Sequence, residues 1–437
     1  MSRLLISFLV FCGICGTTLG QDILTLQEAI QQALLSNYSI QIVRNNQQIA
    51  ENNNTFGNAG FLPRLDASFS DTENKYSQEL LRADDSVVEG DGLRSDNLSA
   101  GIALDWTVFD GFSMFVTQDR LAQEERSAGL QTAAAVASLV ADVTSSYYAI
   151  IQQEKLTEVT RQAMDLSRRR KEISDAKIRI GSGSRLMLLQ SQVDYNADSS
   201  LLIQRIVETE KAKAVLNRIL GRDIRTEFRV TEQVEIDKTL TYDGLLVQMK
   251  SQNPDLRVAE INQKIAELDI KEFKSQFYPQ VNLFGSYDYS RNNFPAGFSF
   301  VQNSTRNGIT FGFGISWNLF NGTYISPNFQ TAKIQKVNSE LQYKENEILL
   351  SDQLFQAYKD YQANLQLVDL ESSNLLLAQE NVSIALDQYQ LGVINDIDLR
   401  AIQLKQVESE TNLLIAQFLA KQSEIGLRLI SGTLTAE

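Results

Sequence analysis

The chain contains one pattern twice, and the two copies stay in register over long stretches. One group of residues recurs 211 positions later: Trp106, Phe109, Gly111, Gly181 and Gly221 correspond to Trp317, Phe320, Gly322, Gly392 and Gly432. Upstream of this group the displacement is 216, since Asn37 and Pro63 recur as Asn253 and Pro279. An internal repeat constrains the architecture more strongly than any single motif. We therefore predict a duplicated element of fixed length, with length variation confined to the region between Pro63 and Trp106.

The repeat also gives the domain organisation that we predict for the 437 residues. Residues 21–221 form the first copy, residues 222–241 a linker, and residues 242–437 the second copy. Each copy begins with a helix, continues with two strands (about 62–109 and 280–320), and ends with a long helix pair (111–221 and 322–432).

Residues 1–20 have the pattern of an export signal. Arg3 precedes the apolar run from Leu4 to Cys15, and Thr18 to Gly20 supply small residues before Gln21. The run is too short to span a bilayer as a helix. Both cysteines lie within it, so we expect a mature chain without cysteine and without an acyl anchor.

Composition argues against nucleic-acid binding and against several classes of enzyme. The formal net charge of −14 makes phosphate backbones poor partners, and we interpret the basic run Arg168–Lys171 as a solvated helix face. The chain contains no histidine, which excludes Ser-His-Asp triads and histidine-ligated zinc. Gly181–Ser184 lacks the lysine of a phosphate-binding loop. We predict a protein that is not an enzyme and has no cofactor.

Four segments alternate between apolar and polar residues, which is typical of half-buried strands. The clearest run from Leu98 to Val108 and from Ile309 to Leu319. About ten residues suffice for a tilted strand to cross a bilayer. A soluble sandwich strand would alternate in the same way. The export signal favours membrane strands, as do the aromatic residues expected at the membrane interface: Trp106, Phe109, Trp317 and Phe320. We predict hairpin loops over residues 72–95 and 290–307.

The remaining segments are typical of long helices. We predict opening helices over about 24–60 and 242–277, ended by Pro63 and Pro279. Pro254 either breaks the second one early or marks its true start. In the long helices an apolar residue recurs every seven positions: Val159, Leu166, Ile173 and Ile180, then Leu370, Leu377, Ile384 and Leu391. Such spacing predicts coiled-coil packing.

Four membrane strands cannot form a closed barrel by themselves, because the smallest single-chain barrels have eight. Open strand edges cannot stand in lipid, since their backbone groups would lack hydrogen-bond partners. The chain must therefore assemble, with two or three copies as the candidates.

The sequence resembles the TolC-type outer-membrane efflux family over nearly the whole mature chain. The resemblance is carried by the helix-to-strand joints, by one strand-to-helix joint and by segments near the end of the second copy. These are Phe61-Leu62-Pro63, Phe277-Tyr278-Pro279, Trp317–Gly322, Tyr389–Val393, Asp396–Leu399 and Ile430–Leu434.

The resemblance implies a homotrimer in which a twelve-stranded outer-membrane barrel continues into a helical periplasmic tunnel. It also implies a periplasmic adaptor that links the channel to an inner-membrane pump, and an export duct for solutes as the function. A periplasmic coiled-coil scaffold or adhesin without channel activity is the alternative.

The resemblance assigns two sets of residues to the hairpin tips. The adaptor would contact Ile180, Gly181, Ser182, Leu391, Gly392 and Val393, although both glycines also suit left-handed helix caps. The tunnel constriction would include Tyr389 and Asp398. The chain departs from the family pattern at Met187, Ile394 and Ala401, so a charged latch at the constriction would differ here.

Overall fold

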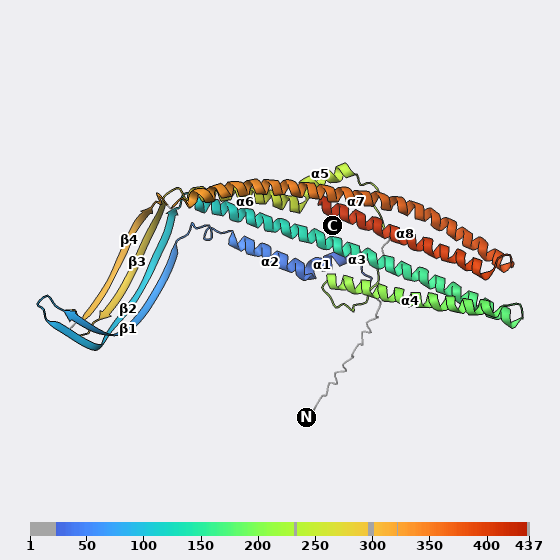
Figure 1. Ribbon diagram of the computed structural model, residues 1–437, viewed down its shortest axis with the longest axis horizontal. Coiled ribbons are helices and arrows are strands. Elements are labelled where there is room, and N and C mark those ends of the chain that lie inside the picture. Colours follow the sequence, from blue (N-terminus) through green and yellow to red (C-terminus); the bar gives the residue numbers. More distant parts are fainter. Residues whose placement is uncertain (1–22, 231–233, 296–300, 321, 435–437) are drawn as a thin grey trace, which may run out of the picture. The chain divides into compact units, whose positions relative to one another are not determined.

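The computed structural model describes residues 23–230, 234–295, 301–320 and 322–434, and the predicted signal peptide lies outside them. The described residues form two compact units, whose helices and strands are labelled in Figure 1. The helical unit takes its described residues from 1–39, 136–246 and 354–437, and the sheet-bearing unit comprises 40–135 and 247–353. Each unit therefore combines segments of both repeats.

The two repeats contain the same elements in the same order. The first has α1 (Leu26–Ser36), α2 (Tyr38–Asn53), β1 (Arg64–Leu81), β2 (Val87–Phe109), α3 (Ser113–Arg179) and α4 (Arg185–Ile219). The second has α5 (Tyr242–Gln252), α6 (Pro254–Ser275), β3 (Gln280–Asn293), β4 (Asn303–Ser316), α7 (Ile325–Gln390) and α8 (Asp396–Ser431). The predicted mainly helical fold with two in-register repeats is thereby confirmed.

Each opening helix is in fact two helices. The prediction of a single helix over 24–60 was wrong, whereas for 242–277 the expectation that Pro254 marks a helix start is confirmed. The break falls at the equivalent residues Asn37 and Asn253. The side chain of Asn37 accepts a hydrogen bond from the Ser39 N–H at 2.9 Å. Asn253 caps α6 by accepting from the Leu256 N–H at 3.0 Å, and Pro254 occupies the first turn. Asparagine side chains at these positions satisfy backbone donors outside the helical ladder and so begin a new helix.

The sheet consists of four antiparallel strands in the order β1-β2-β3-β4, and the β2–β3 pairing joins the two repeats. Opposed residues of neighbouring strands project from the same face. One face is therefore apolar across the sheet, as two rows show: Leu65–Leu104–Gly285–Phe311 and Ala67–Ile102–Tyr287–Ile309. The other face carries small and polar residues, such as the row Asp66–Ala103–Ser286–Thr310.

The hairpin loops are shorter than predicted. The ladder between β1 and β2 continues from Asn74 opposite Ser95 to Leu81 opposite Val87, inside the segment predicted as a loop over 72–95. Likewise β3 continues to Asn293 and β4 begins at Asn303, inside the segment predicted as a loop over 290–307. Backbone hydrogen bonds do not depend on hydropathy, so the strands continue where the apolar alternation ends.

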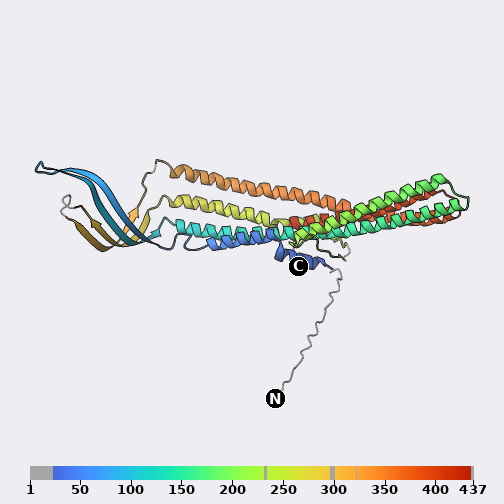
Figure 2. The same cartoon turned by 90° about the horizontal axis from the view of Figure 1, so that it is seen from below.

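In the sheet-bearing unit, helices lie side by side in the order α2, α3, α6, α7 (Figures 1 and 2). Asn54, just after α2, accepts a hydrogen bond from Gln118 of α3 at 2.6 Å. Arg120 of α3 pairs with Glu272 of α6, and Phe277 after α6 contacts the ring of Phe329 in α7. This order leaves α2 and α7 as edge helices, just as β1 and β4 are edge strands.

The core of the helical unit includes the middle of α3. Val143, Tyr147 and Ile150 are buried there, and the Tyr147 hydroxyl donates to the Leu24 carbonyl at 2.7 Å. Among the described residues, α3 alone contains a stretch long and apolar enough to cross a membrane by composition, and half of that stretch is buried within the chain. Partial burial of this kind is also what a core helix would give.

The predicted apolar heptad does not form the packing core within one chain. Val159 is buried, but Ile173 and Ile180 are exposed, as are their counterparts in the second copy, Leu370, Leu377, Ile384 and Leu391. The contact between α3 and α4 is made instead by small and polar side chains. Thr157 lies 3.0 Å from the Thr209 hydroxyl, and Ser167 donates to Asp198. Small residues let α3 and α4 approach each other here, whereas Val159 and Leu166 of the apolar row face α8.

Candidate gate at the ends of the helical hairpins

Two helical hairpins, α3/α4 and α7/α8, turn at equivalent glycines. Gly181 and Gly392 have φ angles of +77° and +72°, which is the left-handed conformation that L side chains rarely adopt. The Ser182 N–H donates to the Lys177 carbonyl at 2.9 Å, and the Val393 N–H donates to the Gln388 carbonyl at the same distance. Both turns are thus left-handed helix caps with the same hydrogen-bond pattern.

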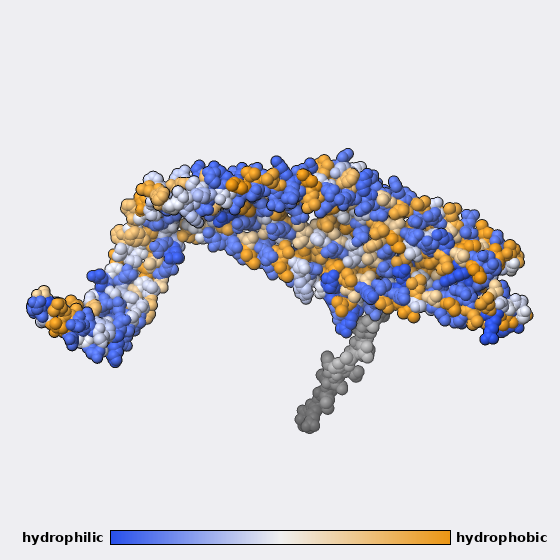
Figure 3. All heavy atoms as spheres, in the orientation of Figure 1, coloured by the Kyte–Doolittle hydropathy of each residue, from blue (hydrophilic) through white to orange (hydrophobic). Residues whose placement is uncertain are grey.

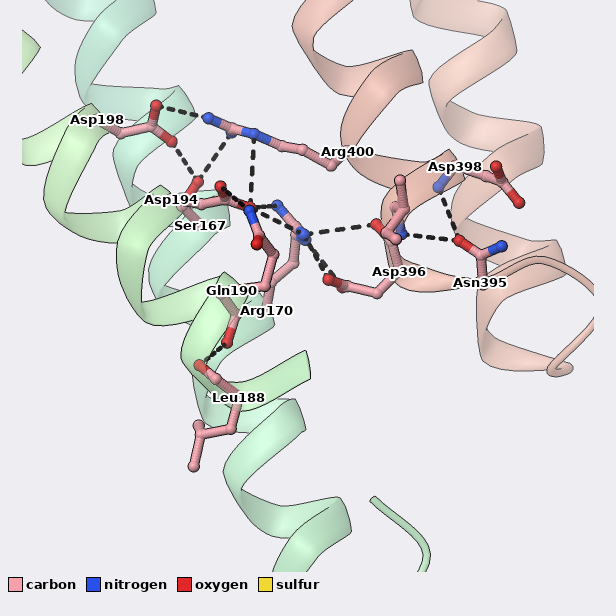
Figure 4. Close-up of polar contacts among 12 residues, drawn as sticks. Ser167, Arg170, Leu188, Gln190, Asp194, Asp198, Asn395, Asp396, Asp398 and Arg400 are labelled. Carbon is pink, nitrogen blue, oxygen red and sulfur yellow. Dashed lines mark hydrogen bonds and ion pairs between the residues drawn. The ribbon is translucent and has the colours of Figure 1, made fainter. Parts of the chain in front are cut away.

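The start of α8 concentrates negative charge. The Asn395 side chain caps the helix by accepting from the N–H groups of Ile397 and Asp398 at 2.8 and 3.0 Å. Asp396 and Asp398 lie in the first turn, where the helix dipole favours carboxylates. The two side chains differ in direction: Asp396 is only 2% exposed, whereas Asp398 is exposed and points away from it (Figure 4).

Asp396 binds an arginine of the other hairpin. Arg170 of α3, also 2% exposed, places Nη2 2.6 Å from Asp396 Oδ2 and Nε 3.1 Å from Asp396 Oδ1. The same guanidinium lies 3.4 Å from Asp194 of α4. A bidentate arginine–carboxylate pair is both strong and geometrically specific.

A second arginine extends this contact. Arg400 of α8 donates from Nη2 to Asp198 at 2.7 Å and from Nη1 to Ser167 at 3.0 Å. We name the six residues Ser167, Arg170, Asp194, Asp198, Asp396 and Arg400 the hairpin latch (Figure 4). It joins α3 and α4 to α8, and losing one buried partner would leave an uncompensated charge.

Tyr389, predicted at the constriction, packs between the hairpins. Its ring is buried with Ala385 and Leu399. Lys177 of α3 places its Nζ 4.5 Å from the ring centre and 3.4 Å from the hydroxyl. Cation–π and hydrogen-bond contacts therefore make a second link between the hairpins, nearer the turns than the latch.

The structure brings some predicted residues together and separates others. Ile180, Leu391 and Val393 are exposed at the two turns, with Leu391 80% exposed. Asp398 does not contact the latch. Arg170 and Asp396 were missed, and the interpretation of Arg168–Lys171 as a solvated face was wrong for Arg170. Arg170 lies seven residues before Lys177 and therefore on the same side of α3. This spacing is the sequence signal that could have identified Arg170.

The aromatic residues predicted at the membrane interface include a tryptophan in each repeat that makes the same contact. Trp106 donates from Nε1 to the Phe61 carbonyl at 2.9 Å, and Trp317 donates to the Phe277 carbonyl at 3.1 Å. Each tryptophan thus ties a strand end to the residue two before the joint proline. Phe109 packs edge-on against Phe112, with ring centres 5.2 Å apart, and Phe320 is exposed.

Comparisons with known proteins agree with this architecture. The model of the family described as outer membrane efflux protein matches residues 29–222 and again residues 245–433. No curated protein sequence matches the chain.

Solved outer-membrane proteins share the fold. Vibrio cholerae VceC is 18% identical, with a TM-score of 0.74 over 93% of this chain and 96% of that one. Campylobacter jejuni CmeC is 14% identical, with a TM-score of 0.75 over 93% and 85%. Neisseria gonorrhoeae MtrE, solved in an open state, is 18% identical, with a TM-score of 0.74 over 94% and 90%. The double family match extends over most of the sequence, and the chain therefore belongs to the outer membrane efflux protein family.

Proposed function

We propose that this protein is a homotrimeric export duct of the outer membrane with a helical periplasmic portion. It passes solutes handed over by a periplasmic adaptor and an inner-membrane pump, and its own residues perform no covalent chemistry. The observation that carries the proposal is the sheet of this efflux-family chain, which has one apolar face and, among the described residues, two unpaired edges.

The strand edges support assembly into a ring. Within the part of the chain that the structure describes, β1 and β4 each have a neighbouring strand on one side only. The apolar face carries exposed residues such as Phe69 and Phe311, the latter 83% exposed. In lipid such a face is stable, but an open edge is not. Three copies would pair β4 of each chain with β1 of the next and close twelve strands, which falls within the range of membrane barrels.

The edge helices of the same unit support the same arrangement. On α2 and just beyond it, Ile42, Ile49 and Phe56 are exposed at intervals of seven. On α7 the exposed residues Ile334, Leu341 and Ile348 have the same spacing. Two such rows can interdigitate as a coiled coil when α7 of one copy meets α2 of the next. This contact is head-to-tail, and such a contact between identical copies forms a ring when the rotation between them closes.

The hairpin latch supports a gated tunnel. It holds α8 against α3 and α4 through buried charges, so separation of the hairpins must break several charged hydrogen bonds together. We propose that the closed duct keeps this latch intact and the open duct breaks it. Asp398 and Tyr389 would then lie at the narrow end, with the exposed carboxylate of Asp398 facing the solute path.

The hairpin turns are the proposed docking surface for the adaptor. Ile180, Leu391 and Val393 expose apolar side chains next to two glycine caps. Figure 3 shows further apolar side chains on the surface of the helical unit, to which both turns belong. An exposed apolar patch on a hairpin turn is typical of a protein–protein contact.

Single-channel recording in planar bilayers tests the proposal. The purified chain should conduct ions as discrete events, and each conducting particle should contain three copies by native mass spectrometry. Trimers that never conduct would favour the alternative of a periplasmic scaffold or adhesin.

A further inference from the structure

A cavity of about 140 Å³ lies within the helical unit, between α3 and α8. One side is formed by Val159, Ala163 and Leu166 of α3, together with Gln162. The other side is formed by one face of α8 with Arg400, Gln403, Gln406, Val407 and Glu410. The cavity therefore begins beside the latch residue Arg400 and continues along the boundary between the two hairpins.

Gln403 is the unusual member of this lining. The residue is only 3% exposed. Both atoms of its amide, Oε1 and Nε2, are buried without a hydrogen-bond partner among the residues that the structure describes. A buried amide without partners destabilises the closed packing, and an apolar residue of similar size at this position would not.

The cavity has the size and chemistry to hold water. Its volume exceeds the space needed for a single water molecule, whose share of liquid volume is about 30 Å³. Gln162, Gln403, Gln406 and Glu410 supply donors and acceptors from both helices. Burial raises the pKa of Glu410, which agrees with a poorly solvated site for that carboxyl group. Water that bridges these groups could satisfy Gln403 while the helices remain separated.

We propose that this cavity is a hydration site that keeps the boundary between the hairpins underpacked, so that they can part when the latch opens. The proposal rests on the proposed duct and its gate. Its role differs from that of the latch: the latch holds the hairpins together by charge, and the hydrated cavity limits how tightly apolar packing can hold them. If the boundary were dry and filled by side chains, α3 and α8 would pack so tightly that the hairpins could not separate.

The test replaces Gln403 by leucine, which removes both polar atoms and keeps nearly the same volume. The Gln403→Leu trimer should melt about 3 °C higher, because leucine needs no bridging water and packs against the apolar part of the lining. Its open events should become rarer by about fivefold or more. Gln403→Asn keeps an amide and a wet cavity, so it should open about as often as the unaltered trimer.

Gln379→Leu is the matched control, since Gln379 is exposed on α7. It should change neither the melting temperature nor the open events. A lower melting temperature for Gln403→Leu would overturn the proposal, because it would mean that the amide supports the packing. A higher melting temperature with unchanged opening would also overturn it. Unaltered trimers that never conduct would overturn the duct and this proposal together, whereas conducting trimers insensitive to Gln403→Leu would overturn this proposal alone.

Discussion

Arg170 of α3 and Asp396 of α8 face each other across the two hairpins, and two hydrogen bonds of 2.6 and 3.1 Å join them. Both residues are buried, so neither charge can turn to bulk water when the other is removed. The pair is therefore a better candidate for controlling hairpin separation than any exposed ion pair on the same helices.

Arg170→Met should open the duct. The substitution leaves Asp396 buried without its bidentate partner, and hairpin separation then restores its hydration. We expect open events to increase by about fivefold or more in planar bilayers. Arg168→Met is the control, because Arg168 is exposed and pairs with Asp165 on its own helix. The double variant Arg170→Met/Asp396→Leu should move back toward the closed state. An Arg170→Met trimer that opens no more often than the unaltered one would exclude the latch as a gate.

Ile348→Asp should weaken the trimer. Ile348 is 71% exposed in the single chain and belongs to the apolar row that we place against α2 of the next copy. A carboxylate at that contact would be desolvated without a partner. Native mass spectrometry in mild detergent should detect mostly monomers. Gln342→Asp, at another exposed position of α7, should leave trimers intact. Persistent Ile348→Asp trimers would place the contact between copies on another face.

Leu391→Glu/Val393→Glu and, separately, Gly392→Pro should abolish export while leaving trimers in the outer membrane. The first change charges the exposed apolar turn. The second is incompatible with the φ angle of +72° and removes the N–H that donates to the Tyr389 carbonyl. Crosslinking to the adaptor should decrease together with export. Leu391→Met, which keeps the apolar contact, serves as the control. Normal export by the charged variant would mean that the adaptor docks elsewhere.

Asp398→Asn should weaken block by divalent or trivalent cations added from the periplasmic side. Three symmetry-related copies of this exposed carboxylate would form a ring of negative potential at the narrow end, and such rings attract multivalent cations. Half-block should need roughly tenfold more cation in the variant, because the amide keeps the size and loses the charge. Asp387→Asn, at an exposed position of α7, is the comparison. Equal block in unaltered and Asp398→Asn trimers would make Asp398 an ordinary surface carboxylate.

Tyr361 should confer a loss of stability at alkaline pH. Its hydroxyl donates to the Asp237 carbonyl, and burial raises the pKa of Tyr361 to about 12, with the charges of Asp237 and Glu424 adding to the increase. A raised pKa stabilises the folded state fully below the unfolded value near 10, and this contribution is lost as the pH rises through about 12.

Melting temperatures between pH 8 and pH 12 would measure this effect. The Tyr361→Phe protein should be less stable than the unaltered one at pH 8, and the difference should shrink above pH 10. Tyr358→Phe is the control, because its ring lies beside that of Tyr361. A constant difference across this range would contradict the assignment.

The sequence contained enough to predict the elements and their order, because the repeat and the two hydrophobic periods are properties of each segment alone. The alternation from Leu98 to Val108 predicted a strand that the structure contains within β2. The same approach failed beyond Asp71, where the ladder continues through polar residues. Hydropathy reports what surrounds a strand, whereas pairing depends on the backbone.

The latch could not be predicted, because it depends on how two distant segments lie in space. Arg170 and Asp396 are 226 residues apart. Within the sequence each resembles a common surface feature: Arg170 lies in a basic run, and Asp396 lies in the acidic first turn of a helix. The resemblance to the family predicted a role for Asp398, two positions after Asp396 on the same helical turn. The family motif identifies this turn but carries no information on the contact between Arg170 and Asp396.

The register of the repeat has a consequence for the symmetry of the proposed trimer. A ring of three duplicated chains is approximately sixfold, with six hairpins in succession. The position 211 residues after Arg170 is Asn381, and the position 211 residues before Asp396 is Arg185, so duplication did not produce a second copy of this ion pair. Around the ring, boundaries between hairpins that contain the Arg170–Asp396 ion pair would alternate with boundaries that lack it. Opening would then widen the ring at every second boundary, and the channel would dilate with threefold symmetry.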